Sequence, residues 1–425
     1  MSTIPVHAAG AADGRWHVAR VASAPHRLGF FAAAVLMAAT ALWWTLALAA
    51  RHAGWHWPWS VPPAAAHGLA MSLGFMPMFI VGFAFTAGPR WLGLPEVPAA
   101  RLLFGVSGYA GGWLLALAGF AFEPRLAAAG MASAALAWTT LGLRFARLVR
   151  QSRAPDRLHA KAVLAAGSVG ALAMALGAWS VGAGDATLAR VAAQLALWGF
   201  LAPTFAIVSH RMIPFFTASA LPLLDAWRPT WLLWAMLAAL AASACGAIAA
   251  LLWWPLPRAA HLALAALQWP AAALLLWLAL RWGLVQSLRI RLLAMLHGGF
   301  LWFGLALALA GAENLRAFAW PGLPSLGLAP LHALTMGYLG ATLIAMVTRV
   351  AAGHSGRPLA ADNVAWTLYL VLQAATVLRV GAELWPQAAA TLLMAAALCW
   401  SAACAGWAWR YGGWLGRPRV DGRAG

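Results

Sequence analysis

Long apolar runs alternate with short polar segments along almost the whole chain after residue 27. A helix needs about 20 mostly apolar residues to cross a bilayer, and a segment in lipid must satisfy its own backbone polar groups. The runs are continuous, whereas the strands of a membrane barrel alternate with a period of two residues. The pattern therefore predicts an all-α polytopic membrane protein with about twelve transmembrane helices, at 28–50, 64–87, 102–121, 126–143, 162–182, 188–208, 230–253, 259–281, 290–311, 330–348, 364–381 and 387–409.

The basic residues indicate how these spans are oriented. If the N-terminus lies inside, 22 of the 28 Lys and Arg residues fall in segments on the inner side. Basic residues accumulate on the cytoplasmic side of membrane proteins, so both termini are predicted to be cytoplasmic and the protein to lie in the inner (plasma) membrane. The chain then divides into a cytoplasmic tail at 1–27, a twelve-helix transmembrane domain at 28–409 and a second cytoplasmic tail at 410–425.

Composition supports this class and excludes others. The chain is 64% apolar and only 9% charged, far less charged than a soluble protein of 425 residues. The net charge of +18 does not predict nucleic-acid binding, because the basic residues are spread over the loops and form no patch. Membrane lipid is the expected surrounding. The three cysteines lie within spans and form no CxxC pair, so neither a disulfide nor a zinc site is predicted.

Histidines, rather than carboxylates, are the candidate functional groups within the membrane. All ten Asp and Glu residues fall in loops or at span edges, which disfavours a proton-coupled transporter. His67 opens the second span and His332 opens the tenth. Both spans run inward, so both imidazoles are expected at the outer ends of parallel helices. In each case a methionine, Met71 or Met336, follows four residues later on the same helix face.

Two imidazoles at one depth could hold a haem between them, because neutral imidazole is a standard axial ligand of haem iron. We predict His67 and His332 as the ligands of a haem, which is expected to be b-type. Met71 and Met336 are expected to pack against the cofactor or the core rather than to act as ligands. The open alternative is that each histidine is an interfacial residue hydrogen-bonded to a loop.

A second set of polar residues is predicted near the cytoplasmic ends of the spans. His297 lies about 10 Å inside the ninth span, at about 1.5 Å per residue. His210 closes the sixth span and His354 follows the tenth, and these three histidines are candidate ligands of a second metal. Arg90 and Arg349 share this rim, and guanidinium groups suit haem propionates, phosphate or carboxylate. An ordinary basic rim without a ligand is the open alternative.

Three stretches resemble the NnrS family, and together they extend from the second to the tenth span. The stretches run from His67 to Trp91, from Arg211 to Thr217 and from His332 to Leu359. The third is the most specific, because it is long and its spacing is intact. Four histidines match positions of the family: His67, His210, His332 and His354.

The resemblance implies a twelve-span bacterial membrane protein associated with haem, with copper and with the response to nitric oxide. Members often carry a second His and a Glu just after the first His of the second span. This chain has Leu69 and Ala70 there, so no ligand or proton role is carried over to those positions.

The arrangement is also distantly similar to subunit I of the haem-copper oxidases. Those subunits have twelve spans and hold a low-spin haem between outer-half histidines of the second and tenth spans, which His67 and His332 match. The oxidases hold copper with outer-half histidines of the sixth and seventh spans. This sequence has none there, so an oxidase-type binuclear centre is not expected.

Taken with the resemblance, these residues predict a haem-binding inner-membrane protein, also associated with copper. It is expected to act in the nitric oxide response or in protection against nitrosative stress, with nitric oxide as its small-molecule partner. Two alternatives stay open: a transporter of a small molecule, metal or haem, and an assembly factor for denitrification enzymes. The sequence assigns no catalytic residue and identifies no redox partner.

Overall fold

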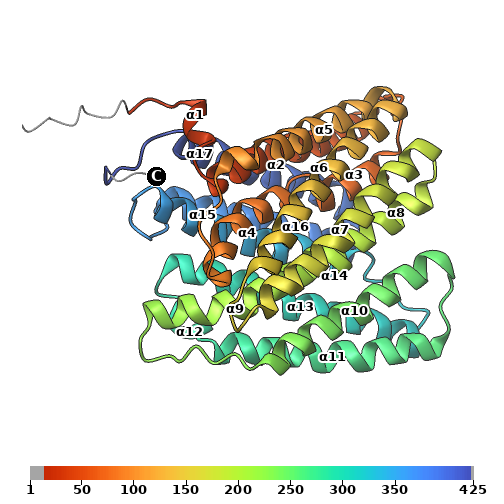
Figure 1. Cartoon of the computed structure of the whole chain (residues 1–425). Coiled ribbons are helices and arrows are strands. Elements are labelled where there is room, and N and C mark those ends of the chain that lie inside the picture. The colour runs from red at the N-terminus through yellow and green to blue at the C-terminus, as the bar shows by residue number, and fades with distance from the viewer. Residues whose placement is uncertain (1–13, 423–425) are drawn as a thin grey trace, which may run out of the picture.

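The computed structural model describes residues 14–422, is 81% helical and contains no strand in that range (Figure 1). The first part of the predicted N-terminal tail, residues 1–13, therefore lies outside the described residues. Twelve helical segments in the described range are long and apolar enough to cross a membrane. The prediction of an all-α polytopic membrane protein with about twelve spans is confirmed.

Nine spans are single α-helices, and three are built from consecutive helical segments. The single helices are α2 (Pro25–His52), α5 (Leu103–Phe122), α6 (Pro124–Gln151), α7 (Leu158–Ala183), α10 (Thr230–Leu252), α11 (Arg258–Arg281), α13 (Arg291–Ala319), α16 (Asn363–Leu384) and α17 (Ala389–Leu415). The divided spans are α3 (Pro63–Leu73) with α4 (Met76–Leu92); α8 (Ala186–Leu195), η2 (Ala196–Leu201) and α9 (Ala202–Ala220); and α14 (Ala329–His332), η3 (Ala333–Gly340) and α15 (Ala341–His354). The remaining segments are short: α1 (Val18–Val21), η1 (Ala99–Arg101), α12 (Leu284–Ser287) and η4 (Pro386–Ala388).

Each predicted span corresponds to one of these segments, but several helices run on past the apolar stretch. The fourth span was expected to end at 143, whereas α6 continues to Gln151. Likewise α2 begins inside the predicted N-terminal tail and α17 ends at Leu415. Apolar length measures only the part of a helix that lies in hydrocarbon, whereas backbone hydrogen bonding continues through arginine-rich ends that lie in the polar headgroup region.

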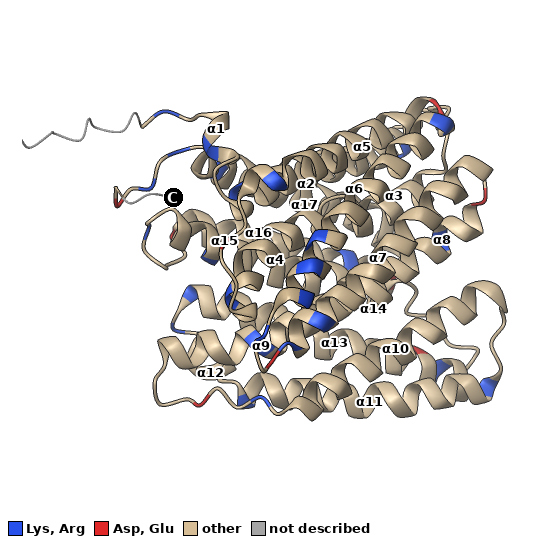
Figure 2. Cartoon of the chain, viewed as in Figure 1, with Lys and Arg blue, Asp and Glu red and all other residues tan. Residues whose placement is uncertain are grey.

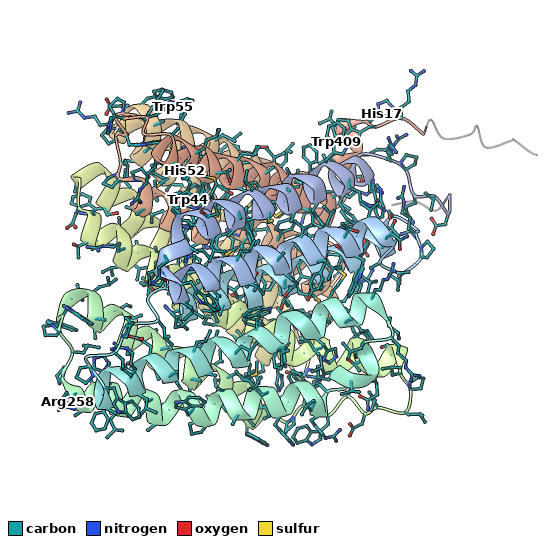
Figure 3. All side chains as sticks on the ribbon, turned by 180° about the vertical axis from the view of Figure 1, so that it is seen from behind. His17, Trp44, His52, Trp55, Arg258 and Trp409 are labelled. Carbon is teal, nitrogen blue, oxygen red and sulfur yellow. The ribbon has the colours of Figure 1, made fainter. Side chains whose placement is uncertain are left out.

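Both ends of the described chain lie at the same end of the helix bundle, as an even number of spans requires (Figure 1). The backbone N–H of His17 donates to the carbonyl oxygen of Gly416 at 2.9 Å. We call this the terminal end and the opposite one the distal end. Figure 3 shows His17 and Trp409 at the terminal end, with His52, Trp55 and Arg258 toward the distal end.

The spans differ strongly in how much of their surface other helices cover. The second and tenth spans, Pro63–Leu92 and Ala329–His354, are 83% and 78% buried over their most apolar stretch, whereas α10 is only 22% buried. Figure 1 shows α10 and α11 along one edge of the bundle, and Figure 2 shows how few charged residues the helices carry. The two spans that hold His67 and His332 are thus the two most buried of the twelve.

Breaks in helical geometry occur in three of the spans, including both of those central ones. Gly74 separates α3 from α4, and Pro77, which lacks a backbone N–H, follows in the first turn of α4. The sixth span contains the π-helix η2, and Pro203 follows it in the first turn of α9. The tenth span contains the π-helix η3, which begins directly after His332. Short π-helices within α-helices are rare and are frequent at functional sites.

Candidate functional site

The structure brings His67 and His332 together at the distal end of the bundle. His67 lies in the second turn of α3, and His332 is the last residue of α14. The two imidazoles are close enough to interact electrostatically, although they are 265 positions apart in the chain. The helices that carry them have different packing neighbours. α3 packs mainly on α8 and α2, whereas α14 and η3 pack mainly on α13 and α16.

His67 is oriented by an aromatic neighbour rather than by a hydrogen bond. Its imidazole stacks on the indole of Trp44 from α2, with ring centroids 3.9 Å apart and planes 25° apart. The Nδ1 atom of His67 is buried and has no hydrogen-bond partner among the described residues. A buried polar atom without a partner costs free energy, and such atoms are often explained by a ligand or ion.

His332 has a backbone anchor. Its Nδ1 lies 3.0 Å from the carbonyl oxygen of Leu328, one turn earlier in the chain. Donation to that carbonyl places the proton on Nδ1 and leaves the lone pair of Nε2 free. Metal-binding histidines use this arrangement, in which the second ring nitrogen donates to a carbonyl and so fixes the tautomer and the ring orientation.

The predicted methionines lie beside the two imidazoles and share their partial exposure. His67, Gly68 and Met71 are half-buried on α3, and His332, Thr335 and Met336 are half-buried on the tenth span. These residues are half-buried although they belong to the two most buried spans of the protein.

Arg379 of α16 is a third member of this site. Its guanidinium interacts electrostatically with both imidazoles and forms an ion pair with Glu383 at 2.7 Å. Both residues also line a distal cavity of about 600 Å³, together with Arg51 and His52 at the end of α2. Arg379 therefore belongs both to the surroundings of the two imidazoles and to the wall of this cavity, which neither imidazole lines.

The three histidines predicted near the cytoplasm do not form one site. His297 contacts Thr217, and the ring of His354 packs against that of His26, with ring centroids 4.1 Å apart and planes tilted by 37°. His210 contacts His159, with Nδ1 and Nε2 3.1 Å apart. No group of three His, Cys, Asp or Glu side chains that could hold a metal ion occurs among residues 14–422. The described geometry therefore does not support one metal site shared by His210, His297 and His354.

The predicted arginines also lie apart. Arg90 is exposed and lies 3.6 Å from Glu96, near the His26–His354 pair. Arg349 is half-buried and stacks on Phe216 of α9, with its guanidinium carbon 4.2 Å from the ring centroid. Neither arginine adjoins His67 or His332, because both lie near the terminal end of their spans. Arg379, which was not among the predicted residues, is instead the arginine that interacts electrostatically with both imidazoles.

His297 offers a direct test of a structural role against a metal-binding one. Its Nε2 lies 2.9 Å from the Thr217 hydroxyl, its Nδ1 is unpartnered, and the residue is fully buried. Thr217→Val should therefore destabilise the protein by about 1–3 kcal/mol, because the buried imidazole loses its hydrogen-bond partner. The double variant Thr217→Val/His297→Leu should recover most of that loss in thermal unfolding. Loss of bound metal in His297→Leu alone, without a change in stability, would favour a ligand role instead.

Sequence reasoning missed three residues that the structure places at these sites. Arg379 carried a usable signal, because it is an arginine inside a predicted span, and charged residues within spans are usually functional. Trp44 and His159 carried none. Trp44 is one of 27 tryptophans in the chain. His159 was expected in a loop, whereas the structure places it in the first turn of α7, which begins at Leu158. Their pairing with His67 and His210 depends on how the helices are rotated about their axes.

Comparison with known proteins identifies one family. A family model described as NnrS protein matches residues 20–419, which is nearly the whole chain. No curated protein matches the sequence. The match covers both central spans and all of the histidine pairs described above.

Proposed function

The chain belongs to the NnrS family, and on that premise we propose that it is a haem-binding membrane protein of the nitric oxide response. Membership supports the role in the nitric oxide response at the level of the family. One observation carries the haem proposal. Imidazoles from the two most buried spans lie at the distal end, close enough to interact electrostatically, and each has a ring nitrogen without a hydrogen-bond partner among the described residues.

The surrounding residues suit the binding of a planar ring with acidic side groups. His67 and His332 would supply axial nitrogens, with His332 held by the Leu328 carbonyl and His67 by the face of Trp44. Small and flexible side chains, such as Gly68 and Met71, follow on the same face of α3 and leave room beside the imidazole. Arg379, at the edge of the distal cavity, would pair with a propionate.

When bound, haem supplies one-electron redox chemistry and an affinity for diatomic gases. His67 and His332 would both hold the haem, but the protein anchors the two side chains differently. His67 is the less firmly held of the two, because its Nδ1 makes no hydrogen bond whereas that of His332 bonds to Leu328. Its helix also ends at the Gly74 break only seven residues later.

The absorbance spectrum of the purified protein tests the proposal. We expect a Soret band and about one haem per chain after extraction, with the α-band of a six-coordinate low-spin haem on reduction. A protein that folds and inserts but shows no Soret band would contradict the proposal and favour a transporter or an assembly factor. Metal analysis of the same sample would show whether copper is present, for which His159 and His210 offer only two close imidazoles.

Arg379 should also affect the midpoint potential of the haem. Replacing Arg379 by Gln removes a positive charge near both imidazoles and leaves Glu383 without its ion-pair partner. The oxidised haem carries the greater positive charge, so this change should stabilise it and lower the midpoint potential by tens of millivolts. Redox titration of the Soret band measures the shift.

Two matched variants control this experiment. Arg379→Lys keeps the charge and should leave the potential close to that of the wild type. Arg258→Gln removes an arginine at the same end of the bundle whose guanidinium donates to the Phe318 carbonyl. An equal shift in Arg258→Gln would show that Arg379 has no special proximity to the haem.

A further inference from the structure

The terminal half of the bundle encloses a second, smaller cavity. Its volume is about 60 Å³, and it lies between α4, α9 and α15. The lining is almost entirely apolar, with Phe79, Ala84, Phe205, Met346 and Val347 among its walls. It is separate from the histidine site, because Thr342 on its wall follows His332 by ten residues, or about 15 Å along the helix.

Two buried threonines on this wall have no hydrogen-bond partner. Thr204 and Thr342 are each 3% exposed, both line the cavity, and neither hydroxyl bonds to any described residue. The other hydroxyl on the wall, that of Ser209, is satisfied by Tyr338 at 3.0 Å. An unpartnered hydroxyl in an apolar surrounding costs free energy unless something in the cavity accepts its proton.

Both hydroxyls follow a π-helix. Several helical threonines of this protein donate to the carbonyl four residues earlier, as Thr40, Thr139 and Thr376 do. For Thr204 and Thr342 that carbonyl belongs to Phe200 and Tyr338, which lie in η2 and η3, and neither hydroxyl makes that bond. Two separate spans thus each place an unpartnered hydroxyl on the wall of one cavity directly after a π-helix.

From these features we propose that the cavity binds a small neutral diatomic gas, held by the Thr204 and Thr342 hydroxyls. An engineered apolar cavity of about 150 Å³ takes up benzene or xenon, so one of about 60 Å³ is too small for benzene but has room for a single xenon atom or a molecule of two atoms. Two hydroxyl donors suit a molecule with a weak acceptor atom. Ile80, Phe83 and Val208 on the wall are half-buried, so the cavity reaches the outer surface of the bundle, where a gas dissolved in lipid would enter.

The identity of the gas as nitric oxide rests on the proposed function, whereas the cavity itself does not depend on haem. Both central spans carry a candidate haem ligand at the distal end and a wall of this cavity toward the terminal end. Gas held here would lie within the same two spans as the haem site. The arrangement raises the local concentration of gas inside the protein without a covalent step.

Xenon tests the cavity directly. Crystals of the purified full-length protein under xenon pressure should show one xenon atom between Thr204 and Thr342, and nitric oxide admitted with the xenon should lower its occupancy. Ala84→Leu adds three carbon atoms to the wall and should abolish most of the xenon signal. Thr204→Val/Thr342→Val keeps the volume and should retain xenon while weakening the competition by nitric oxide.

Thr376→Val is the matched control, because it removes a buried hydroxyl that bonds normally to Leu372 and lies on α16. In this variant, both the xenon occupancy and its reduction by nitric oxide should equal those of the wild type. Absence of xenon from the wild type, or density for a fixed water between the two hydroxyls that xenon does not displace, would overturn the proposal. Unchanged xenon occupancy in the presence of nitric oxide would also overturn it. These outcomes are independent of the Soret band, so a failure here is distinct from a failure of the haem assignment.

Discussion

His67→Ala and His332→Ala should each reduce haem content to near background in purified protein. Each substitution removes one of the two imidazoles that the central spans bring together, and a haem that loses an axial ligand loses much of its binding free energy. Removing His67 also frees the face of Trp44, while removing His332 frees the Leu328 carbonyl. The pyridine haemochrome assay measures the ratio of extracted haem to protein, so the haem content is obtained independently of the shape of the Soret band.

The control for this pair is His52→Ala. His52 is exposed at the end of α2, lies at the same end of the bundle and lines the distal cavity, but it has no contact with either imidazole among the described residues. It should retain the wild-type haem content. If His67→Ala and His332→Ala both keep the wild-type spectrum and stoichiometry, these two residues are not haem ligands and the proposed function loses its main support.

Gly112→Leu should prevent stable packing of α5 on α6. A Cβ atom added at Gly112 would lie 2.5 Å from the carbonyl oxygen of Gly130 and 2.9 Å from the backbone nitrogen of Ala134. These neighbours are backbone atoms, so they cannot rotate away as a side chain would, and the helices must separate. We expect a loss of about 3 kcal/mol or more and a large fall in the yield of monodisperse protein.

Gly111→Leu is the matched control for that variant. Gly111 is the preceding residue of the same helix, is exposed on its outer face, and has no atom within 4 Å of an added Cβ. Its leucine would face lipid and should leave the thermal midpoint and the elution profile in detergent close to those of the wild type. Equal behaviour of the two variants would show that the α5–α6 crossing is not as close as the structure has it.

Apolar length alone was enough to locate every span, because burial in hydrocarbon depends on a local property of the sequence. The position of His67 and His332 followed from the same reasoning, since a residue that opens a span running toward the terminal end lies near the distal end of the bundle. The helix ends were less predictable. The extension of α6 to Gln151 and of α2 back to Pro25 involves polar residues that the apolar pattern does not register.

The sequence by itself therefore determined the twelve spans, their order and the shared depth of the two candidate haem ligands. Only the tertiary structure decided which side chains surround them. Trp44 meets His67, and Arg379 approaches both histidines, because of the rotation and crossing of helices that are distant in the chain. The same holds for the unpaired hydroxyls of Thr204 and Thr342, which follow the π-helices of two different spans and line one cavity. The hydrophobic length of a span depends only on its own residues, whereas the rotation of a helix about its axis and its crossing angles depend on how all twelve helices pack together.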